Sequence, residues 1–213
     1  MPAPGLEGLD PRRLVEALLS SPARIVCVTD AYAAAHAWWS RHRATGRLLA
    51  ISLGTGVGAA VLDDGEPLHV SGESPGHLGQ IDVGPCGGQG DGGCESAIGP
   101  DGVQITLEAF VGGAALQRRF GAEPLAALAG LPMDDGFFVA LARAIRVAHA
   151  IYRPDEVALL GGVGAALAPR IEALDGLVRT GLTAIAKPHA RLRAGDSPFL
   201  AATGAARLAS ATP

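Results

Sequence analysis

A short apolar run that ends in a cluster of glycines is the feature that most constrains the fold of this chain. Leu48–Leu53 is apolar apart from one serine and passes directly into the sequence GTGVG at Gly54–Gly58. An apolar run of this length, bounded by glycine, is typical of a buried strand. A second strand is expected after the glycines, followed by a hairpin turn at Asp63–Glu66 (DDGE). The pattern therefore predicts antiparallel strands joined by glycine turns.

Other apolar runs alternate with helical patterns along the chain. Arg24–Val28 (RIVCV) and Glu156–Leu160 (EVALL) are predicted as buried strands, and the first implies a buried Cys27. An alanine-rich helix is expected from about Ala31 to Thr45, ended by Gly46, because glycine commonly follows the last residue of a helix. Capping residues and periodicity predict the other helices: one from Asp10, then Thr106–Phe120, Asp134–Tyr152, Pro169–Ile185 and Ala201–Ala211. This alternation favours an α/β fold.

Composition excludes several classes of protein. The 213 residues are 48% hydrophobic and 18% charged, which is the reverse of the bias found in disordered chains. The net charge of −4 argues against a nucleic-acid surface, for which a basic stripe is expected. No apolar run reaches the roughly 18 residues of a membrane span, and the first residues do not read as a secretion signal. Three cysteines are too few for a disulfide framework, so we expect a cytoplasmic protein without membrane partners.

Three short segments could contact a ligand, and each has a simpler structural explanation. Gly54–Gly58 is either a tight turn or a loop whose backbone N–H groups approach a phosphate, with the Thr55 hydroxyl beside them. Asp30 is either a helix N-cap or a carboxylate at the end of a strand, where α/β proteins form ligand sites. Gly161–Gly164 is either a turn from strand to helix or a surface against which a nucleotide lies. Each signal is short, but their order along the chain is informative.

That order resembles the ROK family of sugar kinases and repressors, which is built on the actin-like ATPase fold. Thr29-Asp30-Ala31 is similar to the family's Asn-Asp-Ala, and Gly76–Gln80 (GHLGQ) to its Gly-Glu-x-Gly-His signature. Leu107–Phe110 (LEAF) resembles the Leu-Glu-Ala-Tyr that ends the family's zinc motif. The resemblance extends from about Pro4 to Leu208 and includes three further segments: Leu53–Gly58, Leu159–Gly164 and Gly204–Ala206.

The resemblance implies a two-lobed α/β fold of the actin-like, ribonuclease H-like class, in which the first strands of the N-terminal lobe are missing. Residues 1–46 and the helix at 199–213 would be a remnant of that lobe, and residues 47–198 the lobe that binds sugar and nucleotide. The implied reaction is phosphorylation of a hexose or a related sugar by ATP with Mg²⁺. Asp30 would be the general base, and His77, Gln80 and Glu108 would bind the sugar. The nucleotide would be contacted by Gly54, Thr55, Gly56, Gly161, Gly162 and Gly164.

The departures from the family pattern concern both the sugar and the phosphates. His77 stands where the family has glutamate, and Gln80 stands where it has a histidine that also binds zinc. Cys86 and Cys94 are weak zinc candidates, because glutamine is a poor zinc ligand and the close-set cysteines of the family are not kept, so we expect free thiols.

The family's first phosphate loop, Asp-x-Gly-Gly-Thr, does not occur in the sequence. The chain is therefore expected to be a sugar kinase that obtains this loop elsewhere, a sugar- or nucleotide-binding protein without catalysis, or a truncated gene product. Missing strands would leave a sheet edge open near residues 24–28. A partner chain, a homodimer or a rearranged terminus would have to cover it, and we expect a homodimer.

Overall fold

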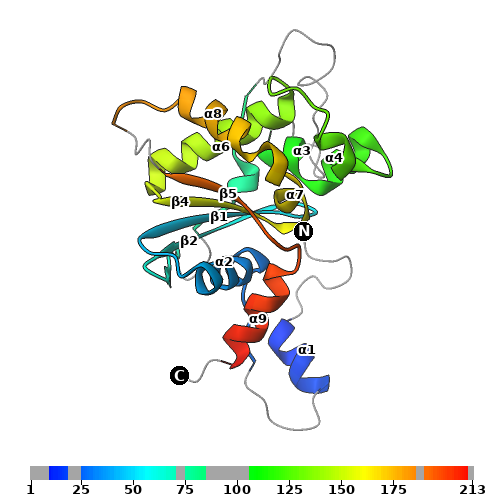
Figure 1. Cartoon of the computed structure of the whole chain (residues 1–213). Coiled ribbons are helices and arrows are strands. Elements are labelled where there is room, and N and C mark those ends of the chain that lie inside the picture. Colours follow the sequence, from blue (N-terminus) through cyan, green and yellow to red (C-terminus); the bar gives the residue numbers. More distant parts are fainter. Residues whose placement is uncertain (1–9, 19–24, 71–74, 85–105, 186–189, 211–213) are drawn as a thin grey trace.

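A single mixed sheet of five strands lies at the centre of the molecule, with helices on both faces (Figure 1). The computed structural model describes residues 10–18, 25–70, 75–84, 106–185 and 190–210. The strand order is β3-β2-β1-β4-β5, and β1 is antiparallel to β2 and parallel to β4. The bounds of the strands are: β1 Arg47–Leu53, β2 Val57–Asp63, β3 Glu66–Pro67, β4 Glu156–Leu160 and β5 Arg191–Ala194.

Two groups of helices cover the two faces of the sheet. In Figure 1, α2 and α9 lie on one side of the sheet, and α3, α6, α7 and α8 lie on the other. The helices in the described residues are: α1 Pro11–Leu18, α2 Asp30–His42, α3 Leu107–Val111, α4 Gly113–Phe120, α5 Pro124–Leu128, α6 Gly136–Tyr152, α7 Gly161–Ala166, α8 Ile171–Thr180 and α9 Leu200–Ser210. Short 3₁₀ turns lie at Leu78–Gln80 (η1) and Ala168–Arg170 (η2).

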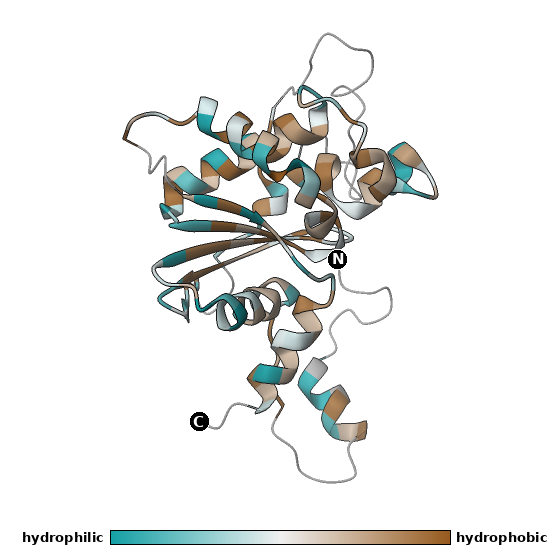
Figure 2. Ribbon diagram, in the orientation of Figure 1, coloured by the Kyte–Doolittle hydropathy of each residue, from teal (hydrophilic) through white to brown (hydrophobic). Residues whose placement is uncertain are grey.

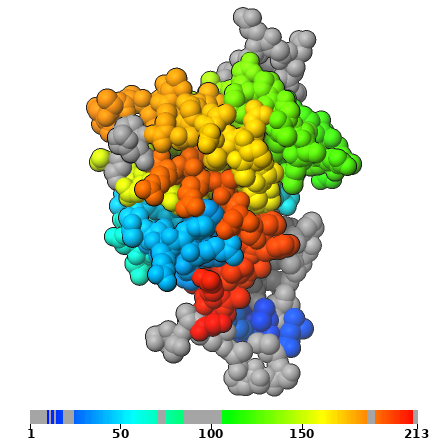
Figure 3. All heavy atoms as spheres, in the orientation of Figure 1, coloured from blue at the N-terminus to red at the C-terminus, as the bar shows by residue number. Residues whose placement is uncertain are grey.

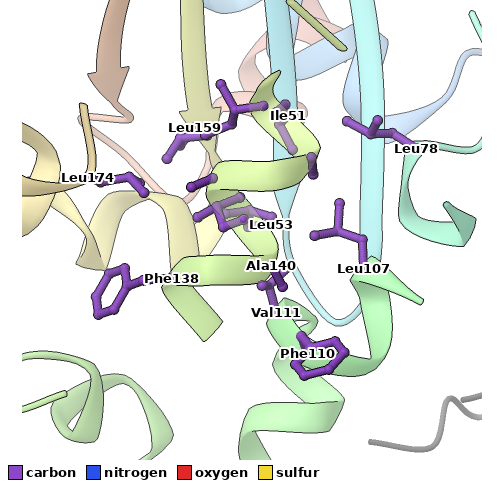
Figure 4. Close-up of a cluster of buried hydrophobic side chains, with 14 of the residues drawn as sticks. Ile51, Leu53, Leu78, Leu107, Phe110, Val111, Phe138, Ala140, Leu159 and Leu174 are labelled. Carbon is purple, nitrogen blue, oxygen red and sulfur yellow. The ribbon is translucent and has the colours of Figure 1, made fainter. Parts of the chain in front are cut away.

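The strand β1 contributes to two hydrophobic cores because successive side chains of a strand point to opposite faces. Leu49, Ile51 and Leu53 pack in the larger core with α3, α6 and α8. Figure 4 shows Ile51 and Leu53 among leucine, valine and phenylalanine side chains of these helices. Leu48 and Ala50 pack on the opposite face beneath α2. Figure 2 shows brown apolar segments in the strands of the sheet and in the helices packed against it.

The helix α2 approaches its neighbours closely because its buried face is made largely of alanine. Its buried residues are five alanines and Trp38, and the alanine side chains allow backbones to come together. On α9, a Cβ added to Gly204 would lie only 1.7 Å from the carbonyl oxygen of Ala33. The two helices lie against each other along one side of the molecule (Figure 3). Only glycine fits at this crossing.

Several sequence predictions are confirmed. The strand at residues 48–53, the hairpin that follows it and the strand at 156–160 are present with small changes of length. The long helix α6 begins after Asp135, whose side chain accepts from the N–H of Phe137. The last helix, α9, lies within one residue of its predicted bounds.

The strand predicted at Arg24–Val28 is wrong. Residues 25–29 have no regular secondary structure, and Cys27 is an exposed free thiol rather than a buried one. An apolar run becomes a strand only where a neighbour completes its hydrogen bonds, and among the described residues no strand pairs with this segment. Conversely, the strand β5 is present but was not predicted, because two of the four residues in its sequence RLRA are arginines.

Some helix bounds also differ from prediction. The helix α2 ends at His42, and Arg43 (φ 46°), not Gly46, is the left-handed residue that follows it; Gly46 has a positive φ (76°) three residues later. The helix predicted over residues 106–120 is two helices, α3 and α4, which meet at Gly112. The helix predicted over 169–185 is the turn η2 followed by α8, which ends at Thr180. The predicted boundary between the lobes at residue 46 falls between α2 and β1, which pack directly on each other. The division into two lobes stays a prediction.

The contact between α9 and α2 predicts a large effect of a single methyl group. Substituting Gly204→Ala should destabilise the protein by more than about 3 kcal/mol, because the new Cβ would overlap the Ala33 carbonyl and the helices must separate. Denaturant unfolding followed by circular dichroism measures the change. The control is Gly176→Ala in α8, where no atom lies within 4 Å of an added Cβ. It should be neutral or stabilise by about 0.5–1 kcal/mol. Equal stability of the two variants would contradict the close contact.

The same region should make stability depend on pH. Burial lowers the pKa of the His36 imidazole on α2, and the positive charge of Arg207 on α9 lowers it further. The imidazole Nδ1 is buried and has no hydrogen-bond partner among the described residues. Since the unfolded chain then binds the proton first, stability should fall as pH drops below about 6.5. We expect His36→Gln to lose less stability than wild type between pH 7.5 and 5.5 in urea titrations. If His36→Gln loses as much stability as wild type between pH 7.5 and 5.5, His36 is not the cause of the pH dependence.

Candidate functional site

Two glycine turns meet at the carboxyl ends of β1 and β4. The strands are parallel, and Ser52 lies opposite Leu160 in their register. The chain leaves β1 through Gly54–Gly56 and leaves β4 directly into α7. Gly161 has φ +81°, and a Cβ on it would lie 2.6 Å from the Leu53 carbonyl oxygen. The second turn therefore packs against the last residue of β1, directly before the first turn, at the edge of the sheet where α/β proteins bind ligands.

The two other glycines of the second turn differ in their surroundings. A Cβ on Gly164 would lie 2.5 Å from the carbonyl oxygen of Leu159, so this glycine is required for α7 to begin immediately after β4. Gly162 has no atom within 4 Å of such a Cβ and faces open space. The three glycines predicted from the sequence to contact a nucleotide therefore divide into two that close the turn and one that leaves room beside it.

The helix α4 fixes the shape of the first turn. The N–H of Gly113 donates to the Gly54 carbonyl oxygen (2.8 Å), and the N–H of Ala114 donates to the Thr55 carbonyl oxygen (3.0 Å). Within the turn, the N–H of Gly54 donates to the carbonyl oxygen of Gly56 (3.1 Å). The side chain of Thr55 remains exposed. The sequence did not predict this contact, because α4 lies almost sixty residues after the turn.

Glu108 lies between the first turn and η1. Its Oε2 accepts a hydrogen bond from the N–H of Val57 (2.8 Å), the first residue of β2. A Cβ on Gly56 would lie 2.5 Å from Oε2, and a Cβ on Gly79 would lie 3.2 Å from it. Glycine at both positions lets the carboxylate approach the backbone. Thr106 caps α3 by accepting from the N–H of Ala109, and this cap fixes the turn of helix that carries Glu108.

The turn η1 brings His77 and Gln80 to the same side of the sheet. Both residues are exposed, and the N–H of Gln80 donates to the carbonyl oxygen of His77 (2.9 Å). The turn is tied to α3, because the N–H of Leu107 donates to the carbonyl oxygen of Ile81 (3.0 Å). A Cβ on Gly79, between the two residues, would lie 2.7 Å from the carbonyl oxygen of Val57. The backbone that carries His77 and Gln80 is thus held beside Glu108.

Asp30 is the first residue of α2 and is exposed. The helix cap is Thr29, whose side chain accepts from the N–H of Tyr32, so the N-cap interpretation of Asp30 is wrong. Its Oδ1 accepts from the N–H of Ala31 (2.7 Å) and would lie 3.7 Å from a Cβ on Gly58. Gly58 follows Val57 in β2, so the carboxylates of Asp30 and Glu108 approach consecutive residues of one strand.

Other sequence predictions concern metal and membrane sites. Cys86 and Cys94 lie outside the described residues. Within the part of the chain that the structure describes, no three His, Cys, Asp or Glu side chains form a group that could hold a metal ion. No helix there is both long and apolar enough to cross a membrane.

Comparison with known proteins identifies the family of this chain. The profile of the ROK family matches residues 2–212. The chain belongs to the ROK family. The resemblance inferred from the motifs is therefore confirmed, and with it the α/β fold of the actin-like ATPase class. No curated protein matches the chain.

Solved structures of ROK proteins resemble most of this chain, over 85–92% of its length. A ROK glucokinase from Streptomyces griseus, solved with glucose and AMPPNP, has a TM-score of 0.69 and 20% identity, over 91% of this chain and 70% of that one. A ROK hexokinase from Thermus thermophilus has a TM-score of 0.65 and 25% identity, over 92% and 67%. A ROK transcriptional regulator, a homolog of the E. coli MLC protein, has a TM-score of 0.63 and 19% identity. This chain spans about half of that regulator (51%).

Proposed function

We propose that this protein transfers a phosphoryl group from ATP to a hydroxyl group of a hexose or a related sugar. The observation that carries the proposal is the pair of carboxylates, Asp30 and Glu108, beside Gly58 and Val57 at the start of β2. Glu108 also packs against Gly56 in the glycine turn that follows β1, and Gly58, beside Asp30, lies two residues farther along the chain. Membership of the ROK family, and the sugar and nucleotide analogue bound to the S. griseus glucokinase, support the same reaction class.

In the proposed reaction, Asp30 is the general base. The sugar hydroxyl oxygen forms a bond to the γ-phosphorus of ATP, the bond from that phosphorus to the β–γ bridging oxygen breaks, and ADP leaves. The hydroxyl proton passes to the Asp30 carboxylate, which is exposed and needs no displacement of a salt-bridge partner in the described residues. A positioned base contributes about 10²–10⁴-fold to such a rate.

The remaining residues bind the two substrates. Glu108 would accept hydrogen bonds from sugar hydroxyl groups, as a charged acceptor suits, with His77 and Gln80 on the adjacent turn. The nucleotide would lie along Gly54–Gly56 and Gly161–Gly164, where backbone groups can approach it. Mg²⁺ characteristically keeps several waters and binds mainly to substrate phosphates with few protein ligands, which suits the few carboxylates at this edge. It would neutralise charge on the transferred group.

A second candidate is binding of sugar or nucleotide without transfer. It is favoured by the absence of Asp-x-Gly-Gly-Thr from the sequence, since phosphoryl transfer depends on neutralising the phosphates and positioning them. A homodimer would not supply this loop, because both copies have the same sequence. We include a homodimer and a cytoplasmic location in the proposal as separate expectations. Calorimetry with sugar and nucleotide analogues separates the candidates: binding without turnover supports the second.

The general base is tested by Asp30→Asn. We expect sugar-dependent ADP release to fall by about 10²–10⁴-fold, while sugar and nucleotide affinities change by no more than a few fold, because asparagine keeps the size of the side chain. The control is Asp10→Asn at the start of α1, where asparagine caps a helix equally well. Circular dichroism checks folding. Turnover by the Asp30 variant at the wild-type rate would refute the proposed role.

A further inference from the structure

The hydrogen bond between Glu108 and the N–H of Val57 connects the proposed sugar site to the glycine turn of the proposed nucleotide site. Glu108 is assigned to the sugar, whereas Val57 is the residue at which the glycine turn becomes β2. The 2.8 Å bond joins a carboxylate to a backbone N–H and is therefore charge-assisted, which makes it stronger than a bond between neutral groups. A movement of this carboxylate would therefore lengthen or break its bond to the residue that directly follows the turn.

The two oxygens of Glu108 have different surroundings. Oε2 is bonded to Val57, and the backbones of Gly56 and Gly79 close around it. Oε1 lies farther from Gly56, at 3.5 Å from the position of an added Cβ, and accepts no hydrogen bond from the described residues. One oxygen thus holds the turn, and the other is left to accept from a ligand.

The backbone around Glu108 is tied to the same turn. Its carbonyl oxygen accepts from the N–H of Gly112 (3.0 Å), where α3 meets α4. The next two N–H groups, of Gly113 and Ala114, donate to the Gly54 and Thr55 carbonyl oxygens. The corner between α3 and α4 therefore makes three hydrogen bonds to Gly54–Val57. Two are made by backbone groups, and the third is made by the Glu108 side chain, which a bound sugar could reposition.

We propose that Glu108 is a positioning residue for the glycine turn as well as a sugar ligand, so that sugar and nucleotide strengthen each other's binding through its carboxylate. This inference rests on the proposed function. A sugar hydroxyl that donates to Oε1 would fix the carboxylate and, through Val57, the turn. A nucleotide arriving second would then meet a turn whose remaining contact, from Glu108 to Val57, is already fixed, and would bind more tightly. Because coupling between binding sites is reciprocal, bound nucleotide would raise the sugar affinity by the same factor.

The test measures the affinity for AMPPNP with and without a saturating hexose, using the tightest binder among glucose, mannose and N-acetylmannosamine. Isothermal titration calorimetry gives the ratio of the two dissociation constants, which is the coupling factor. Wild type is expected to show a factor of about 5 or more, as is typical of coupled sites. Gly56→Ala should reduce it below about 2, because the added Cβ would lie 2.5 Å from Oε2 and push the carboxylate off Val57 while Glu108 itself remains.

Glu108→Gln is the second variant, and it serves if Gly56→Ala does not fold. It keeps an acceptor for Val57 but removes the charge that strengthens both bonds, so the coupling factor should again fall. Glu172→Gln, at an exposed glutamate in the first turn of α8, is the matched control and should keep the wild-type factor. A purely structural role of Glu108 would weaken both ligands without changing the ratio.

The outcomes separate this inference from the proposed function. Loss of coupling in Gly56→Ala and Glu108→Gln, with the control unchanged, supports the inference. A wild-type factor near 1, or a wild-type factor retained in both variants, overturns it and leaves the kinase proposal standing. Wild type that binds neither the sugars nor AMPPNP overturns both.

Discussion

The arrangement of the molecule depends on β1 pairing with strands of opposite direction on its two sides. On one side β2 returns antiparallel through a short glycine turn, and on the other β4 runs parallel, with Ser52 opposite Leu160. Parallel pairing places the ends of β1 and β4 at one edge, so the glycine turns that follow them lie beside each other, with Gly161 packed against Leu53. The antiparallel pairing places the start of β2 at that edge too. The carboxylates of Asp30 and Glu108 meet it there from opposite faces of the sheet.

Features of the fold that depend on neighbouring residues could be predicted from the sequence, and features that depend on distant residues could not. Leu48–Leu53 was predicted correctly because a strand buried on both faces needs apolar residues throughout. The prediction at residues 24–28 was wrong because the pairing that makes a strand involves residues elsewhere in the chain. In β5 the reverse occurs. Arg193 is accommodated by an ion pair with Glu156 and by stacking over the ring of Trp38, and neither contact is visible in the sequence RLRA.

The candidate site divides in the same way. The order of short motifs was enough to identify the family, and the structure brings Glu108, the turn at Gly54–Gly56 and η1 together. The sequence did not indicate that Glu108 binds the backbone of Val57, because 51 residues separate them and a backbone N–H carries no signature. It also favoured Asp30 over Thr29 as a possible cap. Both residue types cap helices well, and only the geometry distinguishes the residue that caps from the one left exposed beside β2.

The close contact of Gly204 with Ala33 has a consequence for the order in which the protein is made. His42, the last residue of α2, and Leu200, the first of α9, are 158 positions apart in the chain. During synthesis, α2 therefore emerges long before the helix that covers its alanine face. Until α9 arrives, the segment that begins at Asp30 rests on the sheet alone, and its outer surface is open to water. The helix that begins with the candidate base is thus synthesised early but completes its packing late. That packing depends on the contact between Gly204 and Ala33, which tolerates no side chain larger than a hydrogen atom.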